Sequence, residues 1–159
     1  LVTHDPHEAL AICDRVAVMK RGEIQQYSTP FEMVSNPSND FVGQFVLQKN
    51  ILPIRYINES YCTSIGTLNF PCHTSISSES VCMFDKNSIR IKACTNNGFT
   101  VIAKEYRINH YVYTVIKDGL KLRSEMSLDT HLSIGDKCKV ETIHEKNYVV
   151  LPENIKSNF

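Results

Sequence analysis

The sequence predicts a mainly β protein, in which a small barrel or sandwich of short strands follows a part made of short helices and a β-hairpin. Apolar and polar residues alternate from Ile51 onward, for example in 89–92 and 111–115, and this is the period of a strand with one buried face. Asp118-Gly119 stands between two such runs, which is a strong signal for a two-residue hairpin turn. Many short strands with regular turns are typical of a small barrel or sandwich.

The first element expected is a short apolar strand at residues 1–3, with His4 at its carboxyl end. Open α/β sheets place their ligand groups at this end of their strands. A helix should follow, with Asp5 as its N-cap, Pro6 as its first residue and Glu8 completing a capping-box-like pattern. The sequence therefore predicts a strand, a polar corner with a histidine, and a capped helix.

This helix is expected to bury the face that carries Ala9, Ile12 and Cys13, which recur at helical spacing. A β-hairpin should come next, with strands at 15–19 and 23–27 joined by a tight turn around a Lys-Arg-Gly sequence.

Two short helices are expected before the β-rich region begins. Thr29 is a natural N-cap for the first, and Pro37 ends it because the residue before a proline is pushed out of helical geometry. Asn39 or Asp40 should cap the second helix, 41–46.

Phe41 and Phe45 lie four residues apart in this second helix, so we expect them to share one face and to dock the helix on a neighbouring domain. The domain organisation predicted is 1–28 for the end of one domain, 29–49 for linking helices, 50–151 for the β-domain and 152–159 for a flexible tail.

Three motifs in the first third of the chain follow one another in a characteristic order. Residues 2–22 surround a Thr-His-Asp sequence, 26–37 contain Thr-Pro-x-Glu followed by Asn-Pro, and 40–46 read Asp-Phe-Val-Gly-Gln-Phe-Val. Together they resemble the end of the ATPase domain of ABC transporters. In that family the first motif contains the switch-region (H-loop) histidine, the position held here by His4.

The resemblance implies that His4 contacts the γ-phosphate of ATP in a full-length parent that uses ATP and Mg. An imidazole suits this role because one ring nitrogen can donate to a phosphate oxygen while a neighbour holds the other. The sequence lacks a Gly-rich phosphate loop, a Leu-Ser-Gly-Gly-Gln signature and a strand ending in Asp-Glu for the magnesium. We therefore expect a C-terminal fragment that is inactive alone and has no cofactor or metal site of its own. The apolar residues of its ATPase part should be short of partners: Val2, Leu10, Ile12, Val16, Val18, Phe41 and Phe45.

The β-rich region is similar to the barrel appended to sugar-, iron-, sulfate-, molybdate- and polyamine-type transport ATPases, a TOBE domain with an OB-like fold. The similarity rests on 81–91, the hairpin around Asp118-Gly119, and the Ile-Gly-Asp-x-Cys-x-Val sequence at 134–140. It implies a regulatory and dimerisation module. The partners implied are a second copy of the same ATPase subunit and the membrane permease subunits. The implied localisation is the cytoplasmic face of the plasma membrane, where the permease would hold the subunit. The solute stays open among iron, polyamine, sulfate and sugar.

A second function is also compatible with the β-domain, namely sensing of a small ligand, an anion or a metal, that modulates the transporter. Four tyrosines could line a cleft and four histidines could hold a metal: Tyr61, Tyr106, Tyr111 and Tyr113, and His73, His110, His131 and His144.

The composition argues against two further kinds of function, nucleic-acid binding through charge and zinc binding through cysteines. The 17 basic and 17 acidic residues cancel, which argues against a nucleic-acid partner bound through charge. The six cysteines include no C-x-x-C pair, so a zinc site is not indicated. We expect reduced thiols, with Cys13, Cys82 and Cys138 on apolar faces.

Overall fold

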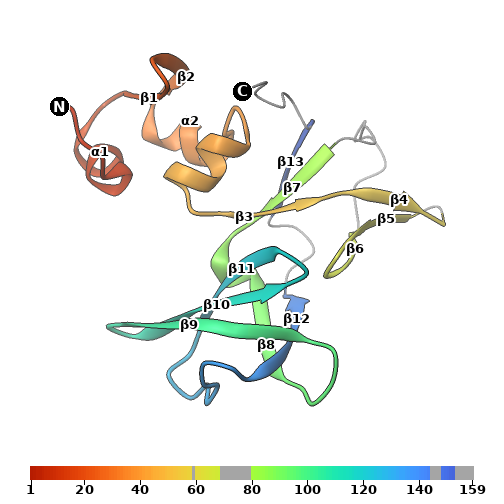
Figure 1. Cartoon of the computed structure of the whole chain (residues 1–159). Helices are drawn as coiled ribbons and strands as arrows, with labels where there is room; N and C mark the ends of the chain where they lie inside the picture. Colours follow the sequence, from red (N-terminus) through yellow and green to blue (C-terminus); the bar gives the residue numbers. More distant parts are fainter. Residues whose placement is uncertain (59, 69–79, 144–147, 153–159) are drawn as a thin grey trace. The chain divides into compact units, whose positions relative to one another are not determined.

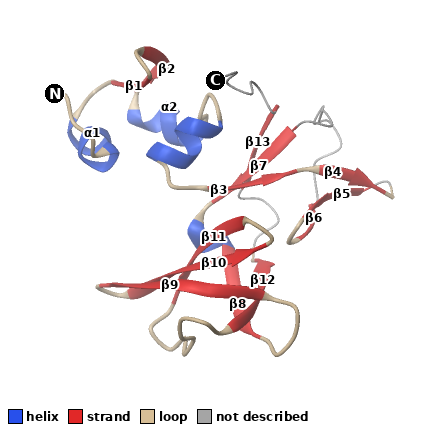
Figure 2. Ribbon diagram, viewed as in Figure 1, coloured by secondary structure: helices blue, strands red, loops and turns tan. Residues whose placement is uncertain are grey.

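The computed structural model describes residues 1–58, 60–68, 80–143 and 148–152 (Figure 1). As predicted, strands dominate and helices are few and short (Figure 2). The chain divides into two compact units. The described residues of the first, here called the N-terminal unit, are 1–54, 80–83 and 149–152, and those of the second, the barrel unit, are 55–58, 60–68, 84–143 and 148.

From Pro6 onward, the N-terminal unit follows the succession of helices and strands that the sequence predicts. Two helices and a helical turn frame one antiparallel hairpin. The elements are α1 (Pro6–Ile12), β1 (Val16–Lys20), β2 (Glu23–Ser28), α2 (Pro30–Ser35) and a π-helix (Val42–Val46).

Both α-helices begin where their caps were predicted. The Asp5 carboxylate accepts a hydrogen bond from the backbone N–H of His7 at 2.8 Å, and a proline occupies the first helical position. At α2, Thr29 and Glu32 form a complete capping box, in which each side chain accepts from the backbone N–H of the other residue. Each helix start thus satisfies donors that would otherwise be unpaired.

The turn between β1 and β2 is the two-residue type expected for a hairpin. Arg21 and Gly22 have φ of 52° and 86°, and positive φ at both central positions gives a turn whose twist matches that of the strands. The predicted hairpin is therefore confirmed.

An apolar core joins the hairpin to the helices. Val18 of β1, Met33 of α2, and Val42 and Val46 of the π-helix are buried together. Leu10, Val16, Phe41 and Leu47 pack against this cluster and are partly buried. The expectation that these residues lack partners was wrong for Leu10, Val16, Val18 and Phe41, because hairpin and helices supply apolar partners to one another.

The predicted strand at residues 1–3 does not form, and Leu1 and Val2 are 73% and 100% exposed. A strand needs a neighbour for its backbone groups, and none of the described residues pairs with this segment. The predicted burial of Ile12 was also wrong. It is 67% exposed because α1 turns Ala9, Leu10 and Cys13 inward instead.

The helix predicted at 41–46 is present, but as a π-helix. Its cap is as expected, since the side chain of Asn39 accepts from the N–H of Val42 at 2.9 Å. The N–H of Leu47 bonds to the carbonyl of Val42 at 3.4 Å, five residues back, which widens the turn relative to an α-helix.

The chain then enters a three-stranded sheet of order β13-β7-β3, formed by β3 (Asn50–Pro53), β7 (Ser80–Phe84) and β13 (Tyr148–Pro152). Every residue of β7 is buried. The Cys82 thiol donates to the carbonyl of Leu52 at 3.4 Å, which adds a side-chain contact between β7 and β3.

The barrel unit is built on five strands in the order β11-β10-β9-β12-β8 (Figure 1). Although β11 and β8 stand at opposite ends of this order, they contact each other. The Ser124 hydroxyl of β11 donates to the Ile89 carbonyl of β8 at 2.5 Å. The sheet thus curls until its edge strands meet, an OB-like partly open barrel. Its strands are β8 (Ile89–Ala93), β9 (Phe99–Arg107), β10 (His110–Lys117), β11 (Leu120–Met126) and β12 (Lys137–Thr142).

The hairpin predicted around Asp118-Gly119 joins β10 to β11, with φ of 49° and 82° at these two residues. Pairing runs without a slip from Lys117 with Leu120 to Tyr111 with Met126. Four further elements complete the described part of this unit. Three form a second sheet, β4 (Arg55–Ile57), β5 (Ser60–Thr63) and β6 (Gly66–Leu68), and the fourth is a 3-10 turn, η2 (Lys86–Ser88).

Among the described residues, the helices are all too short and too polar to cross a lipid bilayer.

Candidate functional site

His4 lies at the surface, in the short segment that leads into α1. Two local hydrogen bonds join the residues around it. The Thr3 hydroxyl accepts from the N–H of Asp5 at 3.1 Å, and the Asp5 carboxylate accepts from the N–H of His7 at 2.8 Å. The structure therefore places the exposed histidine in a polar turn between Thr3 and Asp5.

This corner borders a cavity of about 590 Å³ within the N-terminal unit. Residues 1–6, including His4, form one wall, 16–19 of β1 form another, and 45–46 of the π-helix contribute to the rest. Apolar side chains dominate this lining. The cavity thus brings together the predicted histidine and the apolar face of the hairpin.

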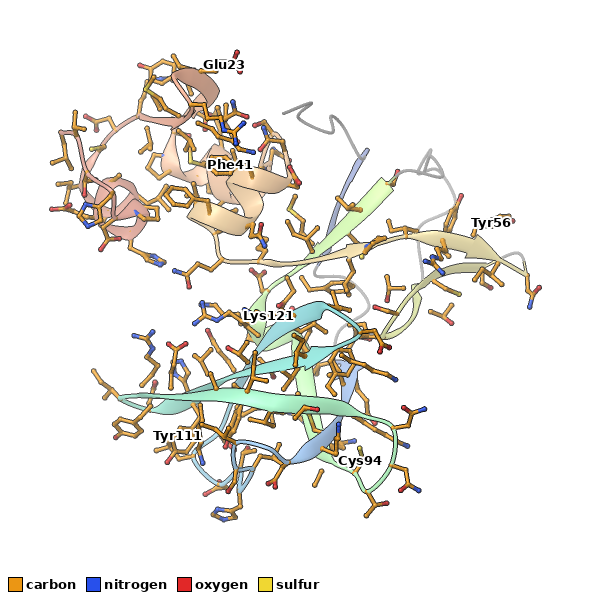
Figure 3. All side chains as sticks on the ribbon, in the orientation of Figure 1. Glu23, Phe41, Tyr56, Cys94, Tyr111 and Lys121 are labelled. Atoms are coloured by element: carbon orange, nitrogen blue, oxygen red, sulfur yellow. The ribbon has the colours of Figure 1, made fainter. Side chains whose placement is uncertain are left out.

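Two basic side chains of the hairpin lie over aromatic rings. Arg15 stands 4.6 Å from the ring centre of Tyr27, and Lys20 stands 4.7 Å from that of Phe41 (labelled in Figure 3). Phe41 also stacks on Phe45, with ring centres 5.3 Å apart and planes within 5°. Of these contacts, the one between Lys20 and Phe41 attaches the hairpin to the segment that links it to β3.

Chemically, the imidazole of His4 can donate a hydrogen bond to an anionic oxygen from one ring nitrogen, and the other nitrogen can accept one from a hydroxyl or a water. The described part of the chain contains no group of three or more histidine, cysteine or acidic side chains placed to hold a metal ion. By itself, His4 can offer one polar contact to a ligand.

Three of the four tyrosines predicted to line a cleft do come together in the barrel unit. The rings of Tyr106 and Tyr111 are 5.8 Å apart, and those of Tyr111 and Tyr113 are 5.9 Å apart, in edge-on geometry (Tyr111 is labelled in Figure 3). Tyr61 instead packs on Tyr56 at 4.9 Å. The prediction of a common cleft was wrong for Tyr61.

A lysine that the sequence analysis missed fills this tyrosine cluster. The Lys104 ammonium lies 4.1 Å from the ring centre of Tyr111 and 5.3 Å from that of Tyr113, and it donates to the Leu132 carbonyl at 3.2 Å. The Tyr113 hydroxyl donates to the Thr130 carbonyl at 2.9 Å. Strand alternation was the available signal, because residues 104 and 106 share one face of β9.

Two arginines on the opposite face of β9 and β11, and Lys86 of η2, are paired with carboxylates. Glu105 accepts from Arg123 at 2.9 Å and from Arg107 at 2.7 Å. The Lys86 ammonium lies 3.9 Å from the Glu125 carboxylate, and desolvation is the main cause that lowers the pKa of this lysine. These three cations are thus already engaged by carboxylates and are not free to bind an anion.

The two proposed metal-binding histidines that lie in the described residues, His110 and His131, do not form a metal-binding group. His110 contacts the neighbouring Asn109 side chain at 2.7 Å and His131 is exposed. Neither belongs to a metal-binding set in the described residues. His73 and His144 lie outside the described residues.

Five cysteines fall within the described residues, and all five are free thiols. Burial raises the pKa of Cys82 to about 12 and that of Cys138 to about 11. Cys13 is only partly buried. None of these five forms a disulfide in the described residues, and Cys72 lies outside them.

No family model matches the chain, but individual curated proteins do. It is 32% identical over 154 residues to the spermidine/putrescine import ATP-binding protein PotA of Mesoplasma florum, which covers 91% of this chain and 44% of that protein. It is 32% identical over 132 residues to the sulfate/thiosulfate import ATP-binding protein CysA of Thermosynechococcus vestitus, covering 83% and 35%. A shorter match, 46% over 56 residues, is to the Fe(3+) ions import ATP-binding protein FbpC of Rhizobium etli.

The chain thus spans less than half of the length of each of these relatives. Three import systems with different solutes share the same kind of subunit, and the two longer alignments each cover more than four fifths of this chain, so both extend into the β-rich region. On this evidence the chain belongs to the ATP-binding proteins of ABC importers.

Proposed function

We propose that the chain is the C-terminal regulatory and dimerisation part of the ATP-hydrolysing subunit of an ABC importer. The observation that carries this proposal is one continuous order of elements: the His4 corner, a capped helix, a hairpin, the linking helices and then an OB-like barrel. The relatives are named for import of polyamines, sulfate and ferric ions. A small solute of this kind, or a sugar, is the proposed cargo.

In this proposal His4 contacts the γ-phosphate of ATP in the full-length subunit, where other segments supply the phosphate loop and the magnesium ligands. Its exposure and the hydrogen-bonded turn on either side of it support the role, because a phosphate contact needs an accessible imidazole on an ordered segment. The apolar cavity beside it would receive the sheet of the ATPase domain. The subunit would work as a pair of copies, bound to permease subunits at the cytoplasmic face of the plasma membrane.

The test is His4→Ala in the full-length ATPase, with His7→Ala as the matched control. His7 is also an exposed histidine and lies two residues into α1, where its ring contacts the side chain of Gln48 at 3.2 Å. Loss of one charge-stabilising donor should lower turnover about 10²-fold, while nucleotide binding and the control stay close to the parent. Unchanged turnover in His4→Ala would overturn the assignment.

A ligand-sensing barrel is the second candidate, and the tyrosine cluster is the feature that favours it. However, Lys104 already occupies the ring faces of Tyr111 and Tyr113. A ligand there would have to displace the lysine ammonium and its bond to Leu132. The dimerisation role needs no such displacement, so it is the function we propose.

A further inference from the structure

Two consecutive glutamines of β2 hold the segment that leads into the π-helix. The Gln26 side chain uses both ends of its amide on this segment. Its nitrogen donates to the Asn36 carbonyl at 3.1 Å, and its oxygen accepts from the N–H of Ser38 at 2.8 Å. The side chain thus replaces the backbone partner that a neighbouring strand would supply.

Gln25 holds the same segment one step further along. Its backbone carbonyl accepts from the Ser38 hydroxyl at 2.8 Å, and its side-chain oxygen accepts from the Asn39 amide at 3.1 Å. The other end of the Asn39 amide accepts from the N–H of Val42 at 2.9 Å. A line of hydrogen bonds therefore runs from β2 to the first residue of the π-helix.

These contacts lie on the same piece of chain as the apolar core formed by Val18, Met33, Val42 and Val46. The core draws the hairpin and the π-helix together, but apolar contact is non-directional. The amide bonds are directional, and both glutamines are partly buried. Core and amides together fix the position of the π-helix relative to the hairpin.

We propose that Gln25 and Gln26 are positioning residues that make the π-helix move together with the hairpin next to His4. A displacement of the hairpin on its His4 side, where the nucleotide would bind, then moves the π-helix and, through it, β3. That nucleotide binding causes this displacement rests on the proposed function. The attachment of the π-helix to β2 is a property of this chain alone and can be tested without ATP.

The first test measures amide hydrogen exchange in the chain itself. Gln26→Met keeps the length of the side chain and removes both the amide donor and the amide acceptor. Gln26→Glu keeps the acceptor for Ser38 and removes the donor to Asn36. We expect exchange at Ser38 to rise about tenfold or more in Gln26→Met, the effect of losing one protecting bond, and much less in Gln26→Glu. Gln25→Met should raise exchange at Val42, because Asn39 loses its anchor.

Gln44→Met is the matched control, since Gln44 is an exposed glutamine of the π-helix. The N–H of Met33, which bonds to the Thr29 carbonyl at 3.0 Å inside α2, reports on global stability. A rise at Ser38 and Val42 with Met33 unchanged supports the proposal. Equal rises at all three amides, or no rise at Ser38, would overturn it.

The second test uses the full-length ATPase with its permease and measures solute transported per ATP hydrolysed. Gln26→Met should keep ATP hydrolysis and lower this ratio at least several-fold, while Gln44→Met changes neither. If His4→Ala leaves hydrolysis unchanged, the proposed function fails whatever Gln26 does. If His4→Ala abolishes hydrolysis but Gln26→Met leaves the amount of solute transported per ATP unchanged, the proposal that the glutamines transmit the displacement is wrong.

Discussion

Gly43 of the π-helix lies directly against the thioether of Met83 on β7. A Cβ atom placed on Gly43 would come within 2.4 Å of the Met83 sulfur and 2.9 Å of its terminal carbon. Met83 is fully buried, so its side chain has little space into which to withdraw. The contact therefore requires a glycine at position 43 as long as methionine stands at 83.

We predict that Gly43→Ala lowers the free energy of unfolding by about 1–3 kcal/mol, the usual cost of overpacking a core. Met83→Val in the same chain makes room for the new methyl group, so the double variant should be more stable than the sum of the two single effects. A thermodynamic cycle from urea unfolding measures this coupling, expected at about 0.5–3 kcal/mol. Strict additivity would show that positions 43 and 83 do not compete for space.

The capping box of α2 predicts a second effect on stability. Thr29→Ala removes the acceptor for the N–H of Glu32 and the donor to its carboxylate, and it should cost about 1 kcal/mol. Ser35→Ala, an exposed hydroxyl at the other end of the helix, is the control and should change stability little. An equal loss in both variants would contradict the role of the cap.

The same box makes the stability of the N-terminal unit depend on pH. Hydrogen bonds from the backbone and then the side chain of Thr29 lower the pKa of Glu32 below its ordinary value of 4.5. A lowered pKa in the folded state means that the stabilisation is complete above the unfolded value and is lost as pH falls through the folded one. The melting temperature of Glu32→Gln, which keeps an acceptor but cannot titrate, should therefore fall less between pH 6 and pH 3. If the melting temperatures of the wild type and of Glu32→Gln fall in parallel as the pH is lowered, Glu32 is not the cause of the pH dependence.

The cysteines provide a test of burial by chemical reactivity. Since burial raises the pKa of Cys82 to about 12 and of Cys138 to about 11, neither forms much of the reactive thiolate near neutral pH. Iodoacetamide at about pH 8 should label the partly buried Cys13, Cys62 and Cys94 first, and peptide mass spectrometry identifies the sites. Labelling of Cys82 as fast as Cys62 would show that β7 opens.

Local signals in the sequence were sufficient for the turns and helix starts. Asp118-Gly119 and Arg21-Gly22 specify their hairpins through positive φ, and Thr29 specifies a helix start through its own side chain. In each case the partner lies within a few residues, so the chemistry can be read from the neighbouring letters.

Contacts between distant residues could not be predicted in this way. The approach of β11 to β8, made by Ser124 and Ile89, joins residues 35 positions apart. The hydrogen bond from Ser38 to Gln26 spans 12 positions. Gln26 opens the 26–37 motif, but nothing in that motif marks this contact, and Gln25 lies outside it. His4 was found from its surrounding motif, whereas Lys104 has only its alternation with Tyr106 to mark it.

The last prediction concerns self-association, on which the dimerisation role depends. The turn between β9 and β10 carries Ile108, which is 91% exposed, and Tyr106 beside it is 66% exposed. A specific contact between two copies should bury about 1,200–2,000 Å² in total, and apolar side chains at such a projecting turn suit its centre. We expect the whole chain to sediment as a dimer at micromolar concentration and Ile108→Asp to shift it toward monomer. Asn109→Asp adds the same charge at the next residue and should leave the dimer in place. A wild-type chain that stays monomeric at high micromolar concentration would remove the dimerisation role and favour the ligand-sensing one.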